Sequence, residues 1–160
     1  MRDVDPTTDV EIAPESPRQD DVVQMIRELD AYIGALYPAE SNHLLDVESL
    51  TGLTVRFFVA RRDGDAIGCG ALRVDGAGYG EVKRMFVRTS ARGLGTGRRI
   101  LGCIEDEARR EGLRVLRLET GVHQPEALGL YRRAGFVERD PFGDYGPDPL
   151  SVFMEKRLYA

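Results

Sequence analysis

Hydrophobic residues recur with helical spacing in three stretches of the chain. Across residues 22–36 they return every three or four positions, which predicts an amphipathic helix that ends before Pro38. A second helix is predicted from residue 94 to about residue 110, where a glycine two positions further on is suited to terminate it. A short third helix is predicted in "PEALGLYRRAGF", residues 125–136, which has proline near its start.

Other segments alternate apolar with polar residues or cluster apolar ones, and these predict strands. Asp63-Gly64 joins two of them and predicts a hairpin. Residues 39–50 fit a short helix or a structured loop, and residues 138–149 fit a turn-rich loop. The predicted strands span residues 10–13, 55–60, 66–74, 81–87, 114–120 and 151–158. Strands interleaved with helices predict an α/β fold, in which helices pack on a mixed sheet.

Length and composition place these elements in one domain. The 160 residues suit a single core, and 42% hydrophobic with 31% charged residues is typical of a globular protein. We expect a flexible tail at residues 1–9 and one domain at residues 10–160. Neither a bilayer-length apolar run nor a secretion signal is present, so the cytoplasm is the expected location. With two cysteines and two histidines, we expect neither a disulfide framework nor a metal site.

Charge is unevenly distributed along the chain. The net charge is −5, and the first 21 residues are rich in acids. Residues 81–99, in contrast, contain six basic residues and one acid, Glu81. A basic island in an acidic protein indicates a small anionic ligand. Nucleic acid would require a wider basic surface, so we expect no nucleic-acid partner.

The segment "ARGLGTGRRI", residues 91–100, lies in that island between a predicted strand and a predicted helix. The first turn of a helix has N–H groups without internal partners, and glycine lets phosphate oxygens approach them. A tight turn that binds nothing is the alternative, which the nearby arginines disfavour. A nucleotide P-loop would need GxxxxGKS or GxxxxGKT, and neither occurs. The GxGxxG motif of dinucleotide-binding folds is matched in part, because Gly93 and Gly95 supply its first two glycines and Glu119 supplies the later acid. The position of its third glycine is occupied by Arg98, which disfavours this class.

Two motifs resemble the GCN5-related N-acetyltransferase (GNAT) family. Arg92-x-x-Gly95-x-Gly97 matches its signature of Gln or Arg, then Gly, then Gly or Ala, and "EALGLYRRAGF" is similar to a later family segment. The resemblance covers roughly residues 10–158. It implies a central, mixed, mostly antiparallel sheet of six or seven strands with a splay, flanked by about four helices. "YPAESNHLL" and "LETG" are further similar to a bacterial subgroup that acts on small molecules.

The resemblance implies acetyl-coenzyme A as co-substrate, and the cysteine and histidine counts above already disfavour a metal. The pyrophosphate would rest on backbone N–H groups from Arg92 to Arg98, and the pantetheine arm would pair with the strand before the loop. Gln124 stands where many family members carry Asn. The implied cofactor-binding residues are Met85, Phe86, Val87, Arg92, Gly93, Leu94, Gly95, Thr96, Gly97, Arg98, Arg99, Gln124 and Tyr131.

The resemblance also implies direct attack of a primary amine on the thioester in a ternary complex. Glu81 matches a family general base, which would take the amine's proton directly or through a water. The alternative to a catalytic role for Glu81 is a structural one, in which its carboxylate pairs with Lys83 or Arg84. Glu119 is the second candidate base. Tyr131 matches the family tyrosine that faces the thioester sulfur, and the pKa of a phenol is not far above that of a thiol.

The acceptor pocket is expected between the first helices, the splayed strands and the loop before the last strand. An amino acid or amino metabolite is the first expectation, and the alternatives are a protein lysine or N-terminus and a non-catalytic acyl-coenzyme A binding module. Arg84 alternates with Glu81 and Lys83, so its side chain is expected to face away from both. We expect no membrane partner, and the exposed last strand leaves a homodimer open. The candidate substrate residues are Tyr37, Ser41, His43, Arg84 and Tyr145.

Overall fold

The computed structural model describes residues 9–41 and 46–159, in which seven strands and three α-helices form. The strands are β1 (Val10–Pro14), β2 (Val55–Arg62), β3 (Asp65–Val74), β4 (Gly80–Val87), β5 (Val115–Gly121), β6 (Val137–Arg139) and β7 (Ser151–Arg157). The α-helices are α1 (Asp20–Leu36), α2 (Thr96–Arg110) and α3 (Pro125–Arg133). Short 3-10 turns form at η1 (Ala39–Ser41), η2 (Ser49–Thr51) and η3 (Thr89–Ala91).

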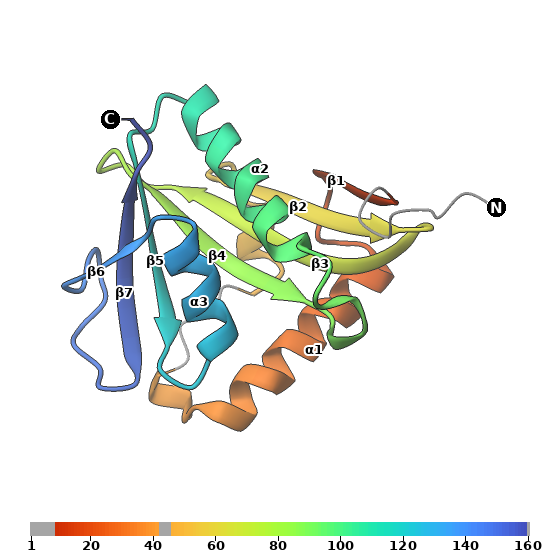
Figure 1. The fold of residues 1–160 in the computed structure, drawn as a ribbon, viewed down its shortest axis with the longest axis horizontal. Helices are drawn as coiled ribbons and strands as arrows, with labels where there is room; N and C mark the ends of the chain where they lie inside the picture. Colours follow the sequence, from red (N-terminus) through yellow and green to blue (C-terminus); the bar gives the residue numbers. More distant parts are fainter. Residues whose placement is uncertain (1–8, 42–45, 160) are drawn as a thin grey trace.

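The strands form one sheet in the order β1-β2-β3-β4-β5-β7-β6. Neighbouring strands run antiparallel, except for β4 and β5, which run parallel. These two strands pair only at Gly80↔Leu116 and Glu81↔Arg117 and then diverge, toward the bottom of Figure 1. The predicted mixed sheet with a splay is confirmed, and the splay lies between β4 and β5.

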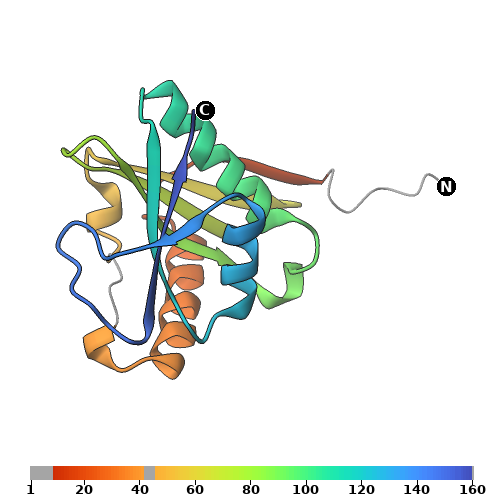
Figure 2. The same cartoon turned by 60° about the vertical axis from the view of Figure 1, so that its left-hand side comes forward.

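The helices cover the two faces of the sheet. Alternate residues of β2 point to opposite faces, so Phe57 and Val59 belong to the core beneath α1, whereas Phe58 and Ala60 belong to the core beneath α2 and α3. Figures 1 and 2 show α1 on the side of the sheet away from α2 and α3. Removing each large apolar side chain from water contributes roughly 2 kcal/mol, so these two layers hold the sheet and helices together.

A β-bulge interrupts the middle of β4. Its pairing with β3 shifts by one residue between Cys69 and Ala71. Gly70 therefore lies opposite both Arg84 and Met85. Arg84 has a left-handed backbone conformation, with φ 56°, which is uncommon for a residue that carries a side chain. A bulge bends its strand and increases the local twist, so this one accompanies the divergence of β4 from β5.

Two expectations about the periphery differ from the structure. About four helices were expected, whereas the described residues contain three α-helices. Residues 39–50 supply the single turns η1 and η2, with residues 42–45 outside the described part of the chain. The last strand was expected to be an exposed edge, and this was wrong, because β7 lies between β5 and β6. β6 was not predicted, since its three residues are mostly exposed and show no buried face.

Residues 1–8 of the expected tail lie outside the described residues. Within residues 9–41 and 46–159, no helix combines the length and the apolar character that crossing a membrane requires.

Candidate active site

The glycine loop between β4 and α2 presents backbone N–H groups. Gly93 and Gly95 have positive φ angles of 85° and 75°, which favour glycine. Gly95 precedes the first turn of α2, which has no side-chain cap and no acidic residue, so its N–H groups and the helix dipole favour an anion. Thr96 adds a buried hydroxyl oxygen that has no hydrogen-bond partner among the described residues. A phosphate group bound here would satisfy that hydroxyl.

A cavity of about 380 Å³ extends from this loop between α1, β4 and α3. The predicted cofactor residues that line it are Met85, Phe86, Val87, Arg92, Gly93, Gly95, Thr96, Gly97, Arg98, Gln124 and Tyr131. Leu94 and Arg99 were also predicted but are not among its lining residues. The lining residues that the sequence did not indicate are Leu29, Tyr32, Ala91, Glu126, Ala127, Leu130 and Arg133. Leu29, for example, belongs to the apolar face of α1, and its spacing in the sequence indicates a core residue rather than a cavity residue.

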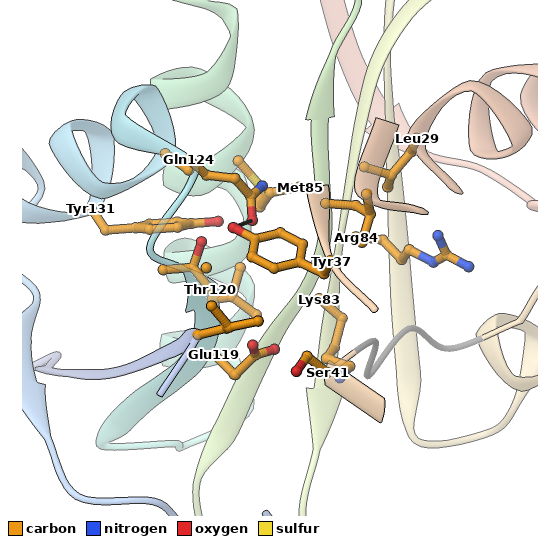
Figure 3. A pocket seen from close by; sticks show the side chains of 15 residues that line it. Leu29, Tyr37, Ser41, Lys83, Arg84, Met85, Glu119, Thr120, Gln124 and Tyr131 are labelled. Carbon is orange, nitrogen blue, oxygen red and sulfur yellow. Dashed lines mark hydrogen bonds between the residues drawn. The ribbon is translucent and has the colours of Figure 1, made fainter. Parts of the chain in front are cut away.

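A smaller cavity of about 90 Å³ lies beside the first, where β4 and β5 have diverged (Figure 3). The residues that line both cavities are Leu29, Met85, Gln124, Ala127 and Tyr131. The other predicted site residues that line the smaller one are Tyr37, Ser41, Arg84 and Glu119. Tyr145 and Glu81 are not among its lining residues, and His43 lies outside the described part of the chain. The two cavities therefore meet at a shared wall that includes Tyr131.

Glu119 lies on β5 beyond its pairing with β4. The hydroxyl of Ser151 donates a hydrogen bond of 3.0 Å to its carboxylate. Burial raises the pKa of Glu119 to about 7, and this outweighs the lowering by the Ser151 bond and by the nearby Lys83 ammonium. A carboxyl group with a pKa near neutrality can both accept and release a proton at physiological pH.

Glu81 lies on β4 within the last residue pair with β5, and its carboxylate is engaged on several sides. Arg73 donates to Oε1 at 2.8 Å, and the hydroxyl of Tyr145 donates to Oε2 at 2.5 Å. The ammonium of Lys83 lies 3.4 Å from Oε2. The side chain is only 1% exposed. The pairing with Lys83, considered above as the alternative to a catalytic role, is therefore present.

Arg84 extends from the bulge of β4 toward α1. Its guanidinium donates a 2.5 Å hydrogen bond to Asp30 of α1, and the side chain is almost fully buried. The predicted orientation away from Glu81 and Lys83 was wrong. Lys83 pairs with Ala71, which belongs to the core beneath α1, and Arg84 also contacts α1. The bulge interrupts the alternation of side chains on which the prediction rested. Arg84 thus ties the bulge of β4 to α1.

Tyr145 anchors the loop before β7. Its ring packs against Phe142 and Phe153, with centroid distances of 5.1 and 5.5 Å. Its hydroxyl reaches β4 through the bond to Glu81. Tyr145 was predicted to be a substrate residue, but in the structure it supports the wall behind the smaller cavity rather than lining it.

Tyr131 of α3 lies where the two cavities meet. Its ring is 5% exposed and packs edge-on against Phe136, with a centroid distance of 5.7 Å. Burial raises the pKa of its hydroxyl, and the negative charge of Glu119 raises it further. The hydroxyl is therefore protonated at neutral pH and can donate a hydrogen bond. The same shift widens the difference between its pKa and that of a thiol beyond what the sequence suggested.

The described residues contain no group of three or more His, Cys, Asp or Glu side chains arranged to hold a metal ion. Cys69 and Cys103 are free thiols, the first buried and the second partly buried. Burial raises the pKa of Cys69 to about 12, so this thiol is protonated and unreactive at neutral pH.

Residues 22–136 match the family model described as "Acetyltransferase (GNAT) family". The chain is 63% identical over 150 residues to an IAA acetyltransferase from Azospirillum brasilense. This match covers 93% of this chain and 98% of that protein. It is also 40% identical over 141 residues to the uncharacterized N-acetyltransferase YsnE from Bacillus subtilis, with coverages of 86% and 92%.

Solved structures show the same fold. A crystal structure from Klebsiella pneumoniae, assigned as an acyl-CoA N-acyltransferase, is 37% identical with a TM-score of 0.80, and the match covers 94% of this chain and 98% of that one. The PaiA N-acetyltransferase of Thermoplasma acidophilum, solved in complex with coenzyme A, has a TM-score of 0.72 at 20% identity, with coverages of 92% and 98%.

Proposed function

The chain belongs to the GNAT family of acetyltransferases, and from this premise we propose that it transfers an acetyl group from acetyl-coenzyme A to the primary amine of a small molecule. The observation that carries the proposal is the contact between the two cavities at Tyr131, with Glu119 inside the smaller one. One cavity can hold the acetyl donor and the other the acceptor.

The larger cavity suits the donor. Its glycine loop offers the N–H groups at the start of α2, and the hydroxyl of Thr96 adds a buried oxygen that a phosphate could engage. Arg92 and Arg98 line the same cavity and supply positive charge. Beyond Glu81, β4 is not paired with β5, so its backbone on that side can bind an extended pantetheine arm.

The smaller cavity suits a small acceptor. Its volume of about 90 Å³ is far below the several hundred that enclose a drug-sized ligand, which favours a compact amine over a polypeptide segment. Glu119 within it can receive the proton that an alkylammonium group must lose before it attacks. We assign the role of base to Glu119 rather than Glu81, because the carboxylate of Glu81 is bonded to Arg73 and Tyr145.

The reaction balances with these groups. Glu119 takes one proton from the ammonium, and the nitrogen lone pair then forms the C–N bond to the thioester carbonyl carbon. The C–S bond breaks, the sulfur leaves as a thiolate, and a second proton from the nitrogen ends on that sulfur. Tyr131 stays protonated and donates a hydrogen bond toward the leaving sulfur, because its raised pKa makes full proton loss costly. Glu119 finally releases its proton to solvent.

A thiol-release assay tests the proposal. The purified chain is incubated with acetyl-coenzyme A and a panel of amino acids, other small primary amines and polyamines, with a lysine-containing peptide as comparison. We expect release with at least one small amine and acetylated product by mass spectrometry. Release with the peptide alone would contradict the small acceptor. Tight acetyl-coenzyme A binding without release for any member would instead favour a binding module.

A further inference from the structure

Tyr37 connects two parts of the site that lie far apart in sequence. Tyr37 caps the C-terminal end of α1, where its backbone N–H donates a hydrogen bond to the carbonyl oxygen of Ile33. Its own backbone is extended, with φ −135° and ψ 146°. Pro38 follows and favours that conformation for the residue before it. The side chain thus leaves the helix and reaches the end of β5 and the start of α3, where it is 8% exposed.

The hydroxyl of Tyr37 is held by two hydrogen bonds. It accepts one of 3.1 Å from the backbone N–H of His123 and donates one of 3.2 Å to Oε1 of Gln124. The ring also stacks on His123, with a centroid distance of 5.5 Å and an interplanar angle of 24°. Burial raises the pKa of the Tyr37 hydroxyl, so it keeps its proton and remains a donor to Gln124.

Gly121 provides the space for this arrangement. A Cβ atom at position 121 would lie 1.7 Å from the Tyr37 hydroxyl oxygen, which no side chain could tolerate without displacement of the ring. The close approach fixes the hydroxyl against the backbone at the end of β5. The fit between Tyr37 and Gly121 therefore limits where the hydroxyl can point.

The bond to Tyr37 decides how the Gln124 amide is oriented. A hydroxyl has one proton, so a Tyr37 hydroxyl that donates to Gln124 selects the amide oxygen and leaves the NH₂ group on the other side. Figure 3 shows the Gln124 oxygen toward Tyr37 and its nitrogen toward Met85. Both Gln124 and Met85 line the two cavities, whereas Tyr37 lines only the smaller one.

We infer that Tyr37 is a positioning residue, which acts through Gln124 to present the amide NH₂ to the carbonyl groups of an acyl-coenzyme A arm. The inference rests on the proposed function, since it presupposes that acetyl-coenzyme A occupies the larger cavity. Tyr37 itself does not line that cavity. Its effect on donor binding therefore depends on the glutamine.

A double-mutant cycle tests the inference by isothermal titration calorimetry with acetyl-coenzyme A. Tyr37→Phe keeps the stacked ring and removes the hydroxyl, and Gln124→Met keeps the length and removes the amide. Each single change should weaken binding about fivefold, which corresponds to the loss of one hydrogen bond. The double variant should bind no more weakly than Gln124→Met alone, because the two residues act as one unit.

A second ligand separates positioning from general loss of structure. Adenosine 3′,5′-bisphosphate contains no pantetheine arm, so its affinity should not change in Tyr37→Phe. Tyr159→Phe, at a half-exposed tyrosine of the C-terminal end, is the matched control and should bind both ligands as the wild type does.

The outcomes are distinguishable. Additive losses in the double variant, unchanged acetyl-coenzyme A binding by Tyr37→Phe, or equal weakening toward both ligands would overturn the inference. If Tyr37→Phe alone folds poorly, the Gln124→Met arm keeps the inference falsifiable, because unchanged acetyl-coenzyme A binding by that variant would overturn it. Absence of acetyl-coenzyme A binding by the wild type would overturn the proposed function as well.

Discussion

Two glutamates on the strands beside the splay have the same chemistry and opposite surroundings. Glu81 lies where β4 and β5 are still paired, and it contacts Arg73, Lys83 and Tyr145. Glu119 lies two positions beyond the end of that pairing and receives one hydrogen bond that the structure describes, from Ser151. Glu81 is buried and Glu119 is half-buried, and burial raises the pKa of Glu119 to about 7.

The groups around each carboxylate, rather than the residue type, account for the difference between the two glutamates. Cations bonded to Glu81 satisfy its charge and make it part of the framework. Where β4 has left, Glu119 faces a cavity, and its desolvated carboxyl becomes able to exchange protons near neutral pH. Substitutions at Glu119, Glu81 and Tyr131 test this contrast.

The largest effect is expected for Glu119→Gln. Loss of a general base lowers kcat by about a hundredfold or more. In the wild type, kcat/KM should rise with pH through about 7, because the carboxylate is the active form, and the variant should lose this step. Steady-state thiol release from pH 5.5 to 9 measures both. A flat profile in Glu81→Gln with a retained profile in Glu119→Gln would reverse the assignment.

The same variant carries a linked effect on stability. The folded-state pKa of about 7 lies above the ordinary value of 4.5, so the folded protein holds a proton that the unfolded chain releases between these values. Wild-type stability should therefore fall as pH rises from 4.5 to 7. Glu119→Gln removes this contribution and should raise Tm relative to the wild type at pH 8. A lower Tm there would indicate that the carboxylate stabilises the fold.

An intermediate effect is expected for Glu81→Gln, and it should appear in stability. The change leaves Arg73 and Lys83 without their shared carboxylate, at a cost of about 2 kcal/mol in the free energy of unfolding after allowance for the partial exposure of Arg73. Urea unfolding measures this cost. Glu138→Gln, which removes an exposed ion pair with Arg132, is the control and should unfold as the wild type does. Equal stability of both variants would show that the Glu81 cluster is not structural.

The smallest effect is expected for Tyr131→Phe. Loss of the hydrogen bond to the leaving sulfur should lower kcat about tenfold, or about 1.4 kcal/mol, without changing the acetyl-coenzyme A Kd. The charge of Glu119 acts on the Tyr131 hydroxyl. The loss of kcat in Tyr131→Phe, expressed as a free energy, should therefore be non-additive with that of Glu119→Gln and additive with that of Glu81→Gln. Full activity in Tyr131→Phe would remove the hydroxyl from the mechanism.

The cofactor side of the site could be predicted from sequence because its chemistry is local. Gly93 and Gly95 adopt the positive φ angles that favour glycine. Arg92 and Arg98 lie in the same short segment and line the same cavity. The helices and six of the strands followed from periodicity for the same reason, since each pattern reports the burial of its own segment.

The acceptor side depends on contacts between distant segments, which periodicity does not report. The position of Glu81 suggested a base, but its partners Arg73 and Tyr145 come from β3 and from the loop before β7. The left-handed backbone conformation of Arg84 accompanies the bulge in β4. An arginine at this position does not indicate such a conformation, so the sequence could not predict it. Gln124 suggested a cofactor contact, whereas its bond to Tyr37 spans 87 positions of the chain.

The short pairing of β4 with β5 also has a thermodynamic consequence. The antiparallel strands β1 to β4 and the group β5 to β7 share only two residue pairs, so the sheet contains an internal edge that a bound molecule can complete. A ligand that binds only the folded chain adds about 2.7 kcal/mol of stability at a hundredfold excess over its Kd. The supply of the acetyl donor would then lower the unfolded fraction of the enzyme about a hundredfold, and with it the susceptibility of the chain to proteolysis.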